Sequence, residues 1–144
     1  MSDNFPRHVM GLAGLGLTPY VGALLAIALG PVSIQGIVVN LLADYSFGII
    51  AFLLGAWWGL TLIRRLPLVL YFSNALFLLA LFCHSLLPAA AWFMVAATLM
   101  MVIWWAEGVH PLFRPQPRYY RHLRGLLSGV SAFCLVLAAA LVGY

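Results

Sequence analysis

Five long apolar runs, separated only by short turns, limit what this chain can fold into. A helix of about 20 apolar residues crosses the hydrocarbon core of a bilayer, which is about 30 Å thick. Charged residues make up 7% of the chain, against about 25% in soluble domains. A water-soluble globule would need more polar surface. The sequence therefore predicts an all-α membrane protein with five transmembrane helices.

The turns between the runs place the expected spans. Residues 32–63 form an apolar stretch too long for one crossing, so we interpret 32–42 as a re-entrant or interfacial segment that precedes the second span. Arg7 and the small residues near Ala26-Ile27-Ala28 also fit a signal peptide, but the apolar run is too long for one, and we expect it to stay as a helix. The chain then forms a single transmembrane domain over residues 1–144, with spans at about 9–29, 44–63, 66–86, 88–108 and 119–142.

Arginine placement predicts the orientation. The chain has no lysine, and with five spans all seven arginines fall on one side of the membrane, whereas dropping a span would divide them between both faces. Positive charge concentrates on the cytoplasmic side of membrane proteins. We therefore expect an N-in, C-out, multi-pass membrane protein. The net charge of +4 then reflects topology, and we expect no nucleic-acid partner.

Small residues predict how the helices pack, because they let helix backbones approach closely within lipid. The first span carries an i, i+4 ladder, and the second carries a similar face that begins at Asp44. We expect these two spans to pack along their ladders, with the last span docked nearby and a kink at Pro19. The expected packing residues are Gly14, Thr18, Gly22, Ala26, Gly48, Ala51, Gly55, Gly59, Gly125 and Gly129.

Asp44 and Trp58 are the candidate functional residues of the second span. An ionisable group at membrane depth indicates function, yet a carboxylate at the start of a helix is also a favourable N-terminal cap. Both interpretations stay open for Asp44, and the cap is favoured. On the same helical wheel Trp58 lies on the glycine face, so we expect it to be buried as packing or as one wall of a pocket. Trp57 points away, as an interfacial aromatic.

Glu107 and His110 lie three residues apart, just after Trp104-Trp105. The simplest interpretation pairs Glu107 with an arginine at the same depth, from the Arg64-Arg65 turn or from the last loop. The alternative is a proton or quinone-headgroup site, for which a carboxylate, a histidine and tryptophans would suit. The sequence contains no catalytic or metal-binding motif. We therefore predict no catalytic residue, no metal and no cofactor, with a quinone or pigment contact only through a host complex.

The segment before the last span is strongly basic. Its arginines recur at close spacing, at positions Arg114, Arg118, Arg121 and Arg124. Anionic lipid headgroups are the partner that such a segment ordinarily binds. An acidic patch on a protein partner is the alternative.

Three short patterns resemble a known family. They are Gly14-Leu15 with Pro19-Tyr20 in the first span; Tyr45, Ile49, Phe52, Gly55, Trp58 and Gly59 in the second; and Tyr119, Tyr120, Leu123 and Arg124 in the last. Together they resemble the bacterial membrane family called domain of unknown function 3429, whose animal relative is transmembrane protein 69. The resemblance implies five helices and no known activity. The family often has His or Arg before its Trp-Gly pair, where this chain has Trp57.

The expected function follows from the scarcity of polar groups and extramembrane mass. We expect a non-catalytic accessory or assembly subunit of a larger complex in a bacterial inner (cytoplasmic) membrane, with respiratory or photosynthetic electron transport as the natural host. A small transporter or lipid-handling protein acting as a homo-oligomer is the first alternative, and it predicts that Asp44 and Glu107 line one water-accessible path. A quinone-binding redox protein is the second, and it predicts a ligand near Trp104, Glu107 and His110.

Overall fold

The described chain is helical and contains five spans long and apolar enough to cross a membrane. The computed structural model describes residues 5–113 and 118–143, and no strand occurs in these two ranges. The first span consists of two helices, and a short 3-10 turn, η1 (Pro111–Phe113), follows the fourth span. The α-helices are α1 (Phe5–Leu15), α2 (Thr18–Leu29), α3 (Val32–Arg64), α4 (Pro67–Leu86), α5 (Ala89–Val109) and α6 (Arg118–Val142). The three spans expected at 66–86, 88–108 and 119–142 differ from α4, α5 and α6 by at most one residue at either end.

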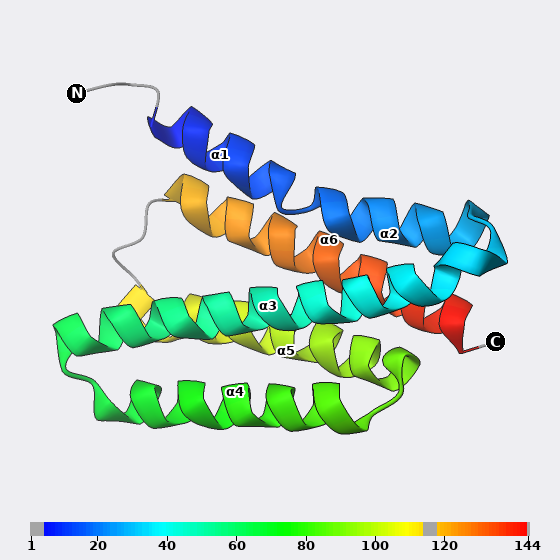
Figure 1. The fold of residues 1–144 in the computed structure, drawn as a ribbon. Coiled ribbons are helices and arrows are strands. Elements are labelled where there is room, and N and C mark those ends of the chain that lie inside the picture. Colours follow the sequence, from blue (N-terminus) through cyan, green and yellow to red (C-terminus); the bar gives the residue numbers. More distant parts are fainter. Residues whose placement is uncertain (1–4, 114–117, 144) are drawn as a thin grey trace.

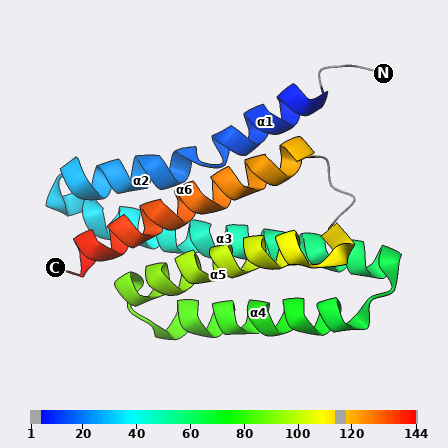
Figure 2. The same cartoon turned by 180° about the vertical axis from the view of Figure 1, so that it is seen from behind.

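The helices run back and forth along one bundle axis (Figures 1 and 2). α5 packs against α3, α4 and α6, while α2 packs against α3 and α6. α3 ends, and α4 and α6 begin, at the same end of the bundle, which we call the arginine end after Arg64, Arg65 and Arg121 (Figure 1). The side chains at the centre of the core are fully buried, among them Ile50, Phe93, Ala96, Ile103 and Leu135.

The first span breaks at Gly16-Leu17, just before the proline at which we expected a kink. Pro19 has no N–H, so the carbonyl of Leu15 loses its helical partner and accepts a hydrogen bond from Thr18 Oγ1 at 2.6 Å instead. The Tyr45 hydroxyl donates to the carbonyl of Gly16 at 2.8 Å. Pro19 itself occupies the first turn of α2, where a missing N–H costs nothing. Two side-chain hydroxyls therefore supply hydrogen bonds to the backbone carbonyls at the break.

α3 is one continuous helix of 33 residues, so residues 32–42 continue into the second span without a break and do not form a separate re-entrant turn. Nothing between Val32 and Arg64 interrupts the backbone hydrogen bonds, because Pro31 lies just before the helix and Pro67 just after it. At 1.5 Å per residue α3 is about 50 Å long, more than the thickness of a bilayer core. Asp44 consequently lies inside the helix, and its interpretation as an N-terminal cap is wrong.

The glycine ladders do not pack against each other, contrary to our expectation. Gly14, Gly22, Gly48, Gly55 and Gly59 are all exposed, and a Cβ at any of them would meet no atom within 4 Å. α3 instead buries a different face, which includes Trp57, against α4 and α5. That buried face consists of Leu42, Ala43, Ser46, Ile50, Leu54, Trp57 and Thr61.

The remaining residues that we expected at helix contacts differ in how closely they are packed. Thr18 is exposed, and Ala26 and Ala51 are half-buried. Gly125 is closely packed, since a Cβ there would lie 3.1 Å from Nε1 of Trp104, whereas a Cβ at Gly129 would meet nothing within 4 Å. Close glycine packing is therefore found where α6 crosses α5, and not between the first two spans.

Candidate functional site

A buried ion pair joins α5 to α6 near the arginine end. Glu107 accepts hydrogen bonds from Arg124 through both carboxylate oxygens, at 2.6 Å from Nη2 and 3.0 Å from Nε. The indole Nε1 of Trp57 on α3 donates to Glu107 Oε1 at 2.9 Å. The side chains of Arg124 and Glu107 are only 9% and 10% exposed. Three helices thus meet at one carboxylate whose charge is balanced by a guanidinium.

This network corrects the roles expected for its members. Glu107 does pair with an arginine of the last segment, as the simplest interpretation had it. Arg124 is therefore not part of a basic surface for lipids or partners, because its guanidinium is turned into the bundle. Arg121 is exposed; Arg114 lies outside the described residues, and the side chain of Arg118 is not among those described.

The burial of the two tryptophans of α3 is the reverse of our expectation. Trp57 is 2% exposed and Trp58 is 40% exposed. Trp57 also lies near Phe113, with ring centroids 5.2 Å apart. Our expectation took the glycine face of α3 as its packing face, so the helical wheel placed each indole on the wrong side. The burial of Trp57 could have been predicted from its chemistry, because its indole N–H is a donor that a carboxylate within the membrane, such as Glu107, requires.

Glu107 and His110 do not share a pocket. Glu107 borders a groove between α5 and α6 that also contains Trp104 and Arg121. His110 borders a separate hollow of about 410 Å³ between α3, α4 and α5, which Trp57 and Phe113 also line. The expected quinone-headgroup arrangement around Trp104, Glu107 and His110 is therefore not assembled in this structure.

Asp44 contacts a histidine that the sequence did not pair with it. Asp44 Oδ1 lies 3.1 Å from Nε2 of His84 on α4, and the Asp44 side chain is 72% exposed. The His84 ring stacks on Phe47 and meets Trp92 edge-on, with both centroid distances 5.0 Å. Nδ1 of His84 is buried without a hydrogen-bond partner in the described chain. This geometry favours the tautomer with the proton on Nε2, because an unpaired acceptor costs less than an unpaired N–H.

The two carboxylates lie far apart. Asp44 and Trp57, the α3 residue that contacts Glu107, are 13 positions apart, which is about 20 Å along the helix. Arg124 and Trp57 occupy the Glu107 oxygens, whereas Asp44 faces outward. The arrangement therefore gives no support to a path lined by both carboxylates.

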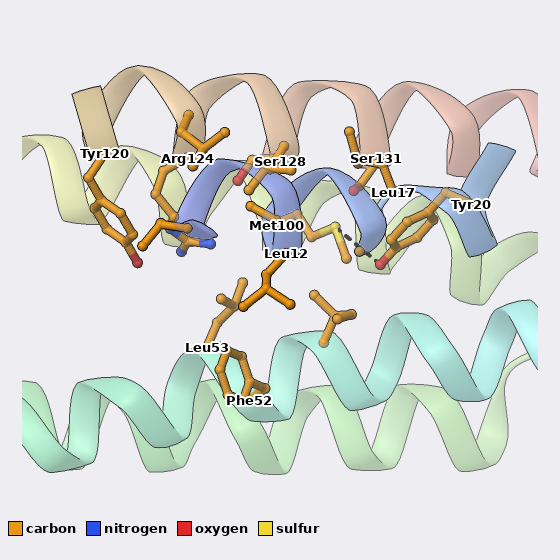
Figure 3. Close-up of a pocket in the computed structure, with 16 residues that line it drawn as sticks. Leu12, Leu17, Tyr20, Phe52, Leu53, Met100, Tyr120, Arg124, Ser128 and Ser131 are labelled. Carbon is orange, nitrogen blue, oxygen red and sulfur yellow. Dashed lines mark hydrogen bonds between the residues drawn. The ribbon is translucent and has the colours of Figure 1, made fainter. Parts of the chain in front are cut away.

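Two hollows lie between the first span and α3. The lateral cavity, of about 250 Å³, lies between α1, α3, α5 and α6; its apolar walls include Leu12, Leu17, Phe52 and Leu53, and its polar lining comprises Tyr20, Tyr120, Arg124, Ser128 and Ser131 (Figure 3). The second hollow, of about 450 Å³, lies between α2 and α3 and contains Gly22, Ala26 and Tyr45. The first span is accordingly the least buried, with 11% of its most apolar stretch inside the bundle.

Comparison with known proteins identifies the family. The family model described as "Protein of unknown function (DUF3429)" matches residues 5–140. The chain belongs to this family. The match begins in α1 and ends in α6, so the family's domain comprises the whole described bundle of this DUF3429 member. No curated protein and no solved structure matches the chain.

Proposed function

We propose that this protein is a non-catalytic accessory or assembly subunit, which docks a transmembrane helix of another subunit on α3. The observation that carries the proposal is the α3 glycine face, formed by Gly48, Gly55 and Gly59 with Phe52 at its edge beside the lateral cavity; a Cβ at any of the three glycines would meet no atom within 4 Å. Glycines at helical spacing permit close backbone approach, which is how membrane helices associate in the absence of a hydrophobic driving force. A partner helix would supply the contacts that the first span does not.

The ion pairs favour a structural role over transport. Glu107 accepts hydrogen bonds from Arg124 and Trp57, which hold this carboxylate in place between three helices and far from Asp44. Polar groups that carry protons or ions through a membrane protein line its interior along a route. The transporter alternative therefore has less support than the subunit proposal.

Orientation and location belong to the same proposal. Arg64, Arg65 and Arg121 lie at one end of the bundle, which the positive-inside tendency places in the cytoplasm, and this gives an N-in, C-out protein. Anionic lipid headgroups are the partners proposed for the exposed arginines. A bacterial inner membrane with an electron-transport complex as host fits this arrangement.

The test is the native mass of the protein after extraction in a mild detergent, with the proteins in the same peak identified by mass spectrometry. We expect the wild type to migrate with a larger complex at fixed stoichiometry. Gly55→Leu should abolish this co-migration, because the added side chain projects from the docking face and meets nothing within the bundle. Ala75→Leu on α4, also exposed, is the matched control and should leave the complex intact.

Two results contradict the proposal. A wild-type protein that runs alone or only as a homo-oligomer excludes the subunit role. A complex that survives Gly55→Leu while the variant retains its helical circular dichroism excludes the α3 glycine face as the docking surface.

A further inference from the structure

A polar stripe on α6 faces the lateral cavity. Tyr120, Arg124, Ser128 and Ser131 follow each other at intervals of four, four and three residues, so they share one helix face over about 16 Å. All four line the cavity, and Figure 3 shows their side chains directed toward it. Polar side chains within a membrane span are costly and mark pathways or sites. This stripe lies apart from the α3 glycine face.

The two serines of this stripe differ from the other buried hydroxyls. Ser46, Thr61 and Ser73 each donate to a carbonyl of their own helix, at 2.8 to 2.9 Å. Ser128 and Ser131 are equally buried, yet neither makes such a bond in the described part of the chain. The Ser128 hydroxyl therefore remains available to a molecule in the cavity, while that of Ser131 interacts with the Tyr20 hydroxyl, which also borders the cavity.

Two further donors border the same space. Arg124 uses Nη2 and Nε for Glu107, while its Nη1 has no hydrogen bond to any described residue. The Tyr20 hydroxyl lies 3.9 Å from the sulfur of Met100, which is a weak acceptor, and it also interacts with the hydroxyl of Ser131. Among the described residues that line the cavity, none is acidic. The cavity thus offers a row of hydrogen-bond donors in an apolar wall.

We infer that the lateral cavity binds the head of a neutral, carbonyl-bearing lipid-like molecule, whose apolar chain leaves between α1 and α3. Carbonyl oxygens match a site that supplies donors. A neutral head fits because the charge of Arg124 is already balanced by Glu107, so an anionic head would add an unbalanced charge beside a buried ion pair. An organic cation would find no carboxylate in the lining.

The size and the opening of the cavity explain why we infer a ligand with an apolar chain. Its volume of about 250 Å³ is below the roughly 300–1,000 Å³ of sites that enclose a whole ligand, so part of the molecule must lie outside. Leu12 and Phe52 line the cavity and are 72% and 71% exposed, which marks the mouth between α1 and α3. An acyl or prenyl chain passing this mouth would enter the surrounding lipid.

The experiment titrates the purified full-length protein in detergent with three probes and measures bound probe by native mass spectrometry. Decylubiquinone and 1-oleoylglycerol carry neutral carbonyl heads from two sources, a quinone and an acyl ester, and dioleoylphosphatidylglycerol carries an anionic one. We expect one molecule of a neutral probe to bind per chain. Ser128→Leu, which fills the cavity, should weaken binding at least about tenfold, and Ser128→Ala with Ser131→Ala about fivefold, since each lost hydrogen bond changes affinity only a few-fold.

Ala140→Leu on the exposed face of α6 is the matched control and should bind like the wild type. The double alanine variant keeps the experiment informative if Ser128→Leu fails to fold. Binding of either neutral probe that is weakened in both cavity variants and unchanged in Ala140→Leu supports the site. The probe that binds then shows whether the carbonyl head comes from a quinone or from an acyl ester. Binding of the anionic lipid alone, binding of no probe, or equal binding by wild type and both cavity variants overturns the inference. Each outcome is independent of whether a partner subunit exists.

Discussion

Glu107 shows how a single carboxylate can organise a membrane bundle. Its oxygens accept hydrogen bonds from α3 and α6, so one side chain of α5 positions three helices at the arginine end. The pair with Arg124 is buried, which makes it expensive to leave either partner alone. The same pairing leaves Arg124 Nη1 without a hydrogen bond to any described residue, and Arg124 also lines the lateral cavity.

Removing both partners of this pair should therefore cost less than the two single removals added together. We expect Glu107→Gln to lower the free energy of unfolding by about 3–5 kcal/mol, because Arg124 is left buried and charged. Glu107→Gln with Arg124→Leu should cost less than the sum of the single changes, with a coupling of at least about 1 kcal/mol. Unfolding in mixed detergent and SDS micelles measures these differences. Additive effects would show that the pair is not coupled.

At the residue scale, the sequence predicted the type of interaction partner better than it predicted the direction in which a side chain points. The partner type for Glu107 followed from the number of arginines at its depth. Trp57 and Trp58 were assigned to the wrong faces, because adjacent residues on a helix are distinguished only once the packing face is known. The Asp44–His84 contact was missed because it depends on the relative depth of two helices, which sequence spacing does not give.

At the scale of elements, α3 differs most from expectation. An apolar stretch longer than a bilayer suggested two segments, yet its backbone contains no break between Val32 and Arg64. Length alone cannot separate a long or tilted helix from a helix with a re-entrant segment. The other boundaries were predicted well because a proline or an arginine pair lies at each turn: proline interrupts a helix, and an arginine pair marks where a span leaves the membrane.

A proline at position 44 distinguishes the two descriptions of α3. Proline is tolerated in the first turn of a helix, but in a helix interior it costs about 3 kcal/mol. Asp44→Pro should therefore destabilise the protein by about that amount, while Asp44→Ala, which removes the same exposed side chain, should change stability by less than about 1 kcal/mol. SDS titration monitored by circular dichroism measures both. Equal stability of the two variants would indicate a helix boundary at this position.

The crossing of α5 and α6 gives a second prediction at this scale. Alanine in place of a helical glycine stabilises by about 0.5–1 kcal/mol when space is available. Gly129→Ala should show this gain, because a Cβ there meets nothing within 4 Å. Gly125→Ala should gain less or lose stability, since its Cβ would lie 3.1 Å from Trp104. The thermal unfolding midpoints of the two variants, measured in one detergent, compare them directly; a larger midpoint for Gly125→Ala would contradict the packing described.

At the scale of the whole molecule, the class of fold was predictable and the packing was not. Apolar runs and scarce charges predict membrane helices because a bilayer demands both. Which faces meet depends on the fit of many side chains at once, and α3 buries the face that includes Trp57 in preference to its glycine face. The lateral cavity follows from this choice, because the first span diverges from α3 at its α1 end (Figure 1).

The most direct test of the subunit proposal is photo-crosslinking in intact membranes. A photoreactive amino acid replaces Phe52 on the α3 glycine face, or Phe82 on α4, which is also well exposed. The account predicts that position 52 forms a crosslink to the protein that co-migrates with the wild type, whereas position 82 forms none. No protein crosslink at position 52, or the same crosslink at both positions, would contradict it.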